Sequence, residues 1–488
     1  MIDVSMPTKP AAPDQYTQKR WTHTALRRRM MSGLWIEDLE EELARHIATD
    51  RRASWGVADL STNVMKSVYV ALAALYNDPP AIGVVGASEG AADLLLERDG
   101  LIERAGLWPM MQRVQELTLA LREMFVRVDT NSHKDGLLFR PVSPDMIWAE
   151  SPAGDPMNPD HLWELRLRKH PDIGNLIWTW DIFDLRDKDN PIYAVREAQD
   201  DGSAGSDMTE LYLGGDMSGS NYPYRQSDGI ARLPYSIYHA TISGSELFDP
   251  FYGAELVAGA LTSAVLSTYL IHLARDCSHP QRYVMGAQLA GAGVYDADGS
   301  ARRSAISSDP ASILVFSPSE DMAGIGQPII GQYSAGGNPG DLMEMITLYE
   351  RKLAQSAGIS AASVQKLSGD PRSGYAIAMS KSDQRDAQRR YAPAMKFGDI
   401  ATIELAAIIS NRFLGSAFPE EGYRVAYSSI PLSKQEAEAI RQDVIDKMSA
   451  GLITPVEAIK SFHPEFSTDE AIEYLREVRR QKIEFGQQ

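Results

Sequence analysis

Two helical patterns separated by a short break occupy residues 341–414. In the first, apolar residues recur at helical spacing from Asp341, a residue type that often caps a helix N-terminus, as far as Gly358. The break covers 360–373, where Gly, Asp and Pro favour a turn. The pattern therefore predicts a helix, an irregular segment and a second helix in series.

The second pattern predicts one very long helix over 374–414. Pro393 and Gly398 lie inside it, and a proline removes a backbone donor and clashes with the preceding turn, so we expect the helix to be interrupted there. The stretch 349–396 carries nine Lys/Arg and four Asp/Glu, although the whole chain has a net charge of −18. A locally basic segment in an acidic protein indicates a specialised surface.

A third helix, predicted over 253–276, contains 19 consecutive residues (256–274) without Asp, Glu, Lys or Arg. That length is enough to cross a bilayer, but Thr262, Ser267 and His272 interrupt the apolar run and favour a packed soluble helix. A helix that is apolar on several faces must be enclosed by other helices. Because the chain offers few long partners, the pattern points to neighbouring subunits.

The remaining pattern is mixed, with helices and strands both in the first half of the chain. Helices are expected within 16–50, 63–76 and 106–128, three antiparallel strands within 161–195, and a further strand at 233–239. We expect 1–16 to be disordered and 200–229 to be a surface loop. Strands near 282–286, 313–317 and 423–427, and three helices after 433, complete an α+β fold that is predominantly helical.

Composition narrows the function classes. A chain of 488 residues is long enough for two to four domains, and its acidic balance, with a pI near 5.0, argues against a protein that coats nucleic acid. The single cysteine, Cys277, excludes an internal disulfide and a CxxC metal site, and a reducing compartment is expected. The N-terminus has no apolar signal segment.

No catalytic or cofactor motif is present in the sequence. The histidines are scattered without HExxH spacing, and no GxxxxGK[ST] phosphate loop occurs. His46 lies one helical turn from Glu42 and from Asp50, which fits a charged solvated helix face better than a metal site. We therefore predict no enzyme activity, no metal and no cofactor.

Several segments, taken in order, resemble the portal proteins of tailed bacteriophages. The helix at 63–80 ends in the pair Pro79-Pro80, as an early portal helix does. The helix at 253–276, the Gly-rich insert and the helix at 341–357 are similar to a stem, clip and stem. The segment 358–377 and the later run 447–458, which contains Gly451-Leu452-Ile453-Thr454, are also similar to portal segments. The resemblance covers most of the chain, except 200–229 and the N-terminus.

The resemblance implies a division of the chain into wing, stem, clip and crown regions. The implied regions are an N-terminal wing at 1–250, stem helices at 251–276 and 341–358, a clip at 277–340, a tunnel loop with the long helix and a wing strand at 359–433, and a helical crown at 434–488.

The resemblance also implies a function without catalysis. Portals form a ring, usually a dodecamer, at one capsid vertex of the virion, and the ring is assembled in the cytoplasm of the bacterial host. Double-stranded DNA enters through the channel during packaging and leaves at ejection, without sequence specificity. The implied partners are other copies of the chain, the large terminase, a head–tail adaptor, and the major capsid and scaffolding proteins, with no membrane.

The resemblance places candidate DNA-facing cations in the tunnel loop and the helix that follows it: Lys366, Arg372, Lys381, Arg385, Arg389 and Arg390. An alternative use of these cations is ion pairing between subunits, for example with Asp383 and Asp386. Three cations of the insert, Arg282, Arg302 and Arg303, are candidates for docking the adaptor or the terminase. The competing class is a mixed α+β enzyme, either soluble or membrane-associated.

Overall fold

The computed structural model describes most of the chain in ordered elements. The described residues are 9–46, 58–86, 90–97, 99–131, 136–242, 244–249, 253–278, 281–285, 287–289, 316–318, 329–333, 337–359, 374–428, 434–462 and 468–485. They form two compact units. The first unit comprises Met1–Ser32, Met65–Ala254 and Ala354–Gln488, and the second comprises Gly33–Val64 and Glu255–Leu353. Helices and sheets occur together, so the α+β class is confirmed.

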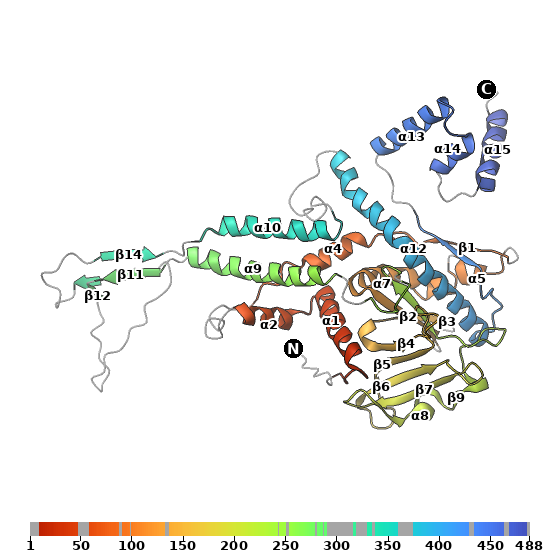
Figure 1. The fold of residues 1–488 in the computed structure, drawn as a ribbon, viewed down its shortest axis with the longest axis horizontal. Coiled ribbons are helices and arrows are strands. Elements are labelled where there is room, and N and C mark those ends of the chain that lie inside the picture. The colour runs from red at the N-terminus through yellow and green to blue at the C-terminus, as the bar shows by residue number, and fades with distance from the viewer. Residues whose placement is uncertain are drawn as a thin grey trace. The chain divides into compact units, whose positions relative to one another are not determined.

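The first unit combines helices with three antiparallel sheets (Figure 1). Its helices are α1 (Gln15–Ser32), α4 (Val64–Leu72, whose first residue belongs to the second unit), α5 (Asp93–Leu96), α6 (Leu101–Arg104), α7 (Leu107–Leu121), α8 (Thr209–Leu213), α12 (Gly374–Phe413), α13 (Lys434–Ser449), α14 (Pro455–Phe462) and α15 (Thr468–Phe485), with 3-10 turns η1 (Pro144–Met146) and η2 (Gly219–Asn221).

The strands of this unit form one six-stranded, one three-stranded and one two-stranded sheet. The six-stranded sheet contains β4 (Ile147–Glu150), β5 (His161–Lys169), β6 (Leu176–Asp184), β7 (Ile192–Ala198), β8 (Ala204–Asp207) and β9 (Met217–Ser218). The three-stranded sheet has the order β10 (Tyr235–His239), β2 (Glu123–Asn131), β3 (Gly136–Val142), and β1 (Ala81–Val84) pairs with β15 (Tyr423–Ala426).

Side-chain alternation in β5 and β6 places buried residues on both faces of the six-stranded sheet. Leu165 and Trp180 are directly opposite each other and pack with Trp21 of α1 on one face. Leu162 and Phe183, also a cross-strand pair, join the main core on the other face. Successive residues of a strand point to opposite faces, so the predicted period of two places one set of side chains in each of the two cores.

Two segments that the sequence predicts to be irregular are part of the core. Ala12, in the N-terminal segment expected to be disordered, is buried against the tryptophan cluster. The predicted loop at 200–229 instead contains two strands and two helical turns, and its Tyr222 and Tyr224 are buried in the main core. The predicted disorder is therefore wrong for 9–16 and the predicted loop is wrong for 200–229, because each mainly polar segment also contains a few apolar side chains that anchor it in the core.

The long helix α12 continues through Pro393 without the predicted interruption. Pro393 is one residue before the buried pair Ala394 and Met395, so core packing holds the helix on both sides of the missing donor. Gly398 allows α12 to pack closely against a neighbouring strand. A Cβ atom there would lie 2.6 Å from Cε1 of Tyr238, so only glycine permits this approach of α12 to β10.

The second unit contains the predicted uncharged helix, here α9 (Ala254–Ser278), together with α2 (Ile36–His46) and α10 (Pro339–Ser356). Between α9 and α10 lie β11 (Gln281–Met285), β12 (Ala287–Leu289), β13 (Phe316–Pro318) and β14 (Ile329–Tyr333). Thus the predicted pair of helices is confirmed, and strands occur in the described residues of the insert between them.

Among the C-terminal helices, α14 begins with the predicted cap. The Thr454 backbone N–H donates to Glu457 Oε2 at 2.7 Å, and the Glu457 N–H donates to Thr454 Oγ1 at 3.3 Å. These reciprocal bonds form a capping box, with Pro455 at the first helical position.

Candidate functional site

The helices α9 and α10 run antiparallel and in close contact (Figure 1). A Cβ at Gly259 would lie 2.7 Å from Cδ1 of Leu353, so the small residue allows α10 to approach α9. Four residues further along α9, Ser263 Oγ donates to Glu350 Oε1 at 2.6 Å. Residues therefore pair in opposite sequence directions, which defines a two-helix hairpin.

The insert between these helices is tied together by a strand pair. β11, just after α9, pairs antiparallel with β14, just before α10, in a register that includes Gln281↔Tyr333. The pairing closes the helical hairpin with a small β structure at its end. Of the predicted docking cations, Arg282 lies in β11 opposite Gln332, whereas Arg302 and Arg303 lie outside the described residues.

Both helices of the hairpin carry large apolar side chains that the second unit does not cover. Ile271 of α9 and Met343, Met345 and Leu348 of α10 are each about half exposed. A contiguous helix pair with this much exposed apolar surface normally contacts another protein surface or a membrane. By length and composition, the span Ala254–Arg275 could also cross a membrane, and half of it is buried within the chain.

Some of the predicted DNA-facing cations lie among the described residues and others lie outside them. The helix α10 ends beside Gly358, at a φ of +83°, where the Ile359 N–H returns to Ala354 O at 3.0 Å. The next segment holds Lys366 and Arg372, which lie outside the described residues.

The remaining predicted cations all belong to α12. The structure places the backbone of Lys381 on this helix, but its side chain is not among those described. Arg385 is half-buried, whereas Arg389 and Arg390 are exposed, and the Arg390 guanidinium lies 5.5 Å from the ring centre of Tyr391. Arg385 and Arg389 are four residues apart, so they share one side of the helix.

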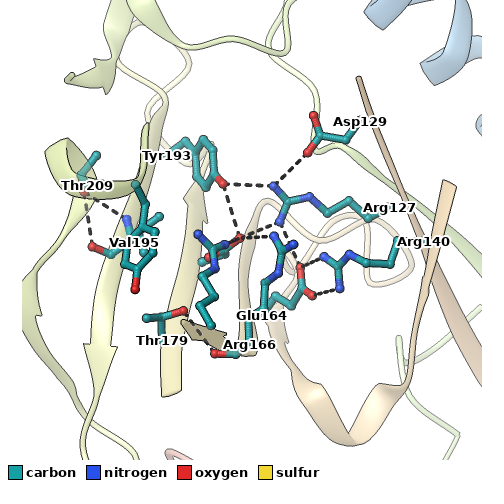
Figure 2. A network of polar contacts seen from close by, with 12 residues as sticks. Arg127, Asp129, Arg140, Glu164, Arg166, Thr179, Tyr193, Val195 and Thr209 are labelled. Atoms are coloured by element: carbon teal, nitrogen blue, oxygen red, sulfur yellow. Dashed lines mark hydrogen bonds and ion pairs between the residues drawn. The ribbon is translucent and has the colours of Figure 1, made fainter. Parts of the chain in front are cut away.

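A buried polar network joins the three-stranded sheet to the six-stranded sheet (Figure 2). Arg127 of β2 is at its centre, and its Nη1 donates to Asp181 Oδ2 at 2.6 Å and to Glu164 Oε2 at 3.1 Å. Its Nη2 donates to the Tyr193 hydroxyl at 3.0 Å, and the Tyr235 hydroxyl donates to Glu164 at 2.5 Å. Five strands (β2, β5, β6, β7 and β10) thus supply one connected cluster.

Further arginines complete the network around its carboxylates. Arg140 forms an ion pair with Glu164 at 2.5 Å, and Arg168 donates to both oxygens of Asp181. Burial would raise the pKa of Glu164, but hydrogen bonding to Arg140 and the charge of Arg127 outweigh it and lower the pKa to about 2. A carboxylate held ionised by arginines in this way is suited to bracing two sheets rather than to proton transfer.

This network was not predicted from the sequence. In alternating strands, the charged positions are normally assigned to the solvent-facing side. The partners are also far apart in sequence: Arg127 and Asp181 are separated by 54 residues. An available signal was Arg127 itself, a charged residue inside the otherwise apolar run of β2.

A second buried carboxylate, Asp399, lies in the middle of α12. Its Oδ1 accepts hydrogen bonds from Tyr76 at 2.8 Å and Tyr238 at 3.0 Å, and its Oδ2 accepts one from Tyr427 at 2.6 Å. Burial raises the pKa of Asp399 to about 6, although the three tyrosine hydrogen bonds act in the opposite direction. Asp399 therefore connects α12 to the β10 and β15 regions and to the segment after α4.

Within the described ranges, no group of three or more His, Cys, Asp or Glu side chains is arranged to hold a metal ion. His239 is buried, and burial together with the charge of Arg122 lowers its pKa to about 4. It is therefore neutral near pH 7.

Comparison with known proteins gives structural likenesses only. No family model matches the chain, and no curated protein matches it. Among solved structures, a chain in the "neck of native GTA particle computed with C12 symmetry" has a TM-score of 0.39 and 12% identity, covering 81% of this chain and 88% of that one. A chain in the "virion of native gene transfer agent (GTA) particle" has a TM-score of 0.40 and 11% identity, covering 81% and 89%.

Proposed function

We propose that this protein is a portal subunit that assembles into a ring and forms the DNA channel at a capsid vertex. The observation that carries the proposal is the antiparallel hairpin of α9 and α10, closed at one end by the β11–β14 pair. It is followed in sequence by the long helix α12. This order is the stem, clip, stem and wing-helix order that the sequence resembles.

The apolar surface of the hairpin supports assembly with other copies. Ile271, Met343, Met345 and Leu348 would be covered by the same helices of neighbouring subunits in a ring. Such a ring is closed by head-to-tail contacts between two different surfaces of the subunit. We propose a dodecamer, located in the virion and assembled in the host cytoplasm.

The remaining roles follow from a ring of this kind. DNA would pass through it during packaging and ejection, in contact with the candidate cations of 366–390 through salt-sensitive, sequence-independent phosphate contacts. The insert would dock the large terminase and later the head–tail adaptor, and the wing would meet the capsid and scaffolding proteins.

Negative-stain electron microscopy and mass photometry of the full chain, purified without detergent, test the proposal. We expect rings with a central hole and a mass many times that of the 53.8 kDa subunit. A monodisperse monomer, or a protein that needs detergent, would instead favour the enzyme alternatives.

A matched pair of variants tests the assembly face. Leu348→Glu should disrupt the rings, because a charge would be buried where covering the half-exposed leucine side chain is worth about 1 kcal/mol per subunit interface. Glu344→Gln, an exposed polar change on the same helix, should leave the rings intact. Intact rings with Leu348→Glu would show that this face is not the subunit contact.

The DNA-channel role has its own variant. Replacing Lys366 and Arg372 with Ala should leave the ring intact and reduce DNA packaging or retention. Loss of the ring would place these cations at subunit contacts instead.

A further inference from the structure

Among the strands that the structure describes, none pairs with the second edge of β10. This strand is the terminal strand of the three-stranded sheet, whose order is β10-β2-β3. At its two ends, the Val128 N–H donates to Pro234 O at 2.9 Å, and the Ala240 N–H donates to Arg122 O at 2.8 Å. Since hydrogen-bonded and non-hydrogen-bonded pairs alternate along an antiparallel ladder, the even-numbered residues of β10 are the ones that bond to β2.

The odd-numbered residues therefore direct their backbone groups away from β2. These are Tyr235, Ile237 and His239, which together offer three N–H donors and three carbonyl acceptors. Within the part of the chain that the structure describes, no hydrogen bond is recorded for these six groups. Proteins normally cover such an edge or protect it with charge or proline, because it is a template for another strand.

A groove of about 1090 Å³ runs along this edge. One wall is a single face of α12, formed by Phe397, Ile400, Glu404 and Ile408, which recur at helical spacing. Within it, Phe397 is 67% exposed although it is a large aromatic side chain. The lining also includes the loop 155–160. A groove between an edge strand and an apolar helix face is the geometry in which proteins bind an extended segment by strand addition.

The charges around the groove favour a basic occupant. Four carboxylates line it, from Asp155, Asp160, Asp228 and Glu404, against two cations, Lys188 and Arg232. Burial raises the pKa of Glu404, and the nearby Arg232 only partly opposes that effect. Acidic side chains therefore outnumber basic ones in the groove, which argues against DNA as the ligand.

We propose that this groove binds an extended segment of a different protein, which adds to β10 as a fourth strand. The segment alternates apolar residues, which face α12, with lysine or arginine residues, which meet the carboxylates. A second copy of this chain is the less suitable occupant because its net charge is −18. The inference does not depend on the assembly state of the protein.

A labelled probe peptide, acetyl-Lys-Val-Lys-Val-Lys-Val-Lys-amide, tests the proposal with the full chain by fluorescence anisotropy. We expect saturable binding below about 1 mM. Two peptides serve as controls: one with Glu in place of Lys, and one N-methylated at alternate residues on its β10-facing edge. Both should bind at least roughly fivefold more weakly, since each loses charge pairing or several hydrogen bonds.

Protein variants locate the bound strand. Ile237→Pro removes a donor that points to the free edge without removing a bond to β2, and edge strands accept proline. It should weaken binding by roughly fivefold or more. Phe397→Ala and the double variant D160N/E404Q should weaken it by roughly three- to tenfold. Ile173→Ala serves as the matched control, because Ile173 is also 67% exposed but lies outside the groove.

Amide hydrogen exchange measured by mass spectrometry distinguishes strand addition from other binding. Residues 235–239 should gain protection when the probe binds. The proposal is overturned if the probe does not saturate, if the Glu peptide binds equally well, or if Ile237→Pro and Phe397→Ala both bind like the unmodified protein. It is also overturned if the probe competes with self-association of this chain, because a second copy would then be the occupant.

Discussion

The buried network around Arg127 makes a quantitative prediction for Glu164→Gln. The Glu164 pKa falls from its usual 4.5 to about 2 in the folded protein. At about 1.4 kcal/mol per pKa unit, this change corresponds to about 3 kcal/mol of stability near neutral pH. Glutamine has nearly the same shape but no charge. We therefore expect the free energy of unfolding to fall by about 3 kcal/mol at pH 7.

The same network determines whether the stability of the protein rises or falls with pH. Because the folded-state pKa of Glu164 is below the unfolded one, its stabilisation is complete above about pH 4.5 and is lost as the pH falls toward 2. The difference between the wild-type protein and the variant should therefore be constant from pH 6 to 8, and should shrink below about pH 4.5.

Urea unfolding followed by tryptophan fluorescence measures this difference, since Trp163, Trp178 and Trp180 lie in the strands that the network joins. Protein concentration must be the same throughout, because assembly stabilises the folded chain. Glu150→Gln is the control: Glu150 is half exposed, 3.7 Å from Arg186, and its loss should cost under about 1 kcal/mol. A loss below about 1 kcal/mol for Glu164→Gln, or one independent of pH, would refute the reasoning.

Two further predictions concern α12. Gly398→Ala should destabilise the protein by about 1–3 kcal/mol in the same urea assay, because the added methyl meets the Tyr238 ring; a gain in stability, which is usual for Gly→Ala in a helix, would contradict the packing. For Asp399 the sign is opposite to that of Glu164: its folded pKa of about 6 is above the usual 3.8, so its contribution is full below pH 3.8 and is lost as the pH rises to 6. The stability lost in Asp399→Asn, relative to the wild-type protein, should therefore be largest near pH 4 and smaller at pH 7. A loss that does not change with pH would contradict the raised pKa of Asp399.

Local sequence was sufficient to predict most elements. The period of two in 161–195 predicted the strands β5, β6 and β7, and helical spacing predicted α9, α10 and α12 nearly to their ends. The cap at Thr454 was also predicted, because capping depends on residues only three positions apart. The sequence likewise located the basic stretch 349–396, although it did not establish what those cations face.

Tertiary structure decided which polar residues meet. Nothing near Asp399 in sequence indicates that Tyr76, Tyr238 and Tyr427 would converge on it, because they come from segments up to 323 residues away. Likewise, the pairing of Arg127 with Glu164 depends on how two sheets pack.

The edge of β10 also shows the difference between what the sequence predicts and what the tertiary structure decides. Its alternating sequence predicts a strand, but only the sheet order shows that one side of it is unpaired among the described strands and that α12 borders a groove beside it. Sequence periodicity reflects contacts within a few residues, so it determines where helices and strands form. Sites depend on contacts between distant segments, whose positions are set by burial summed over the whole unit.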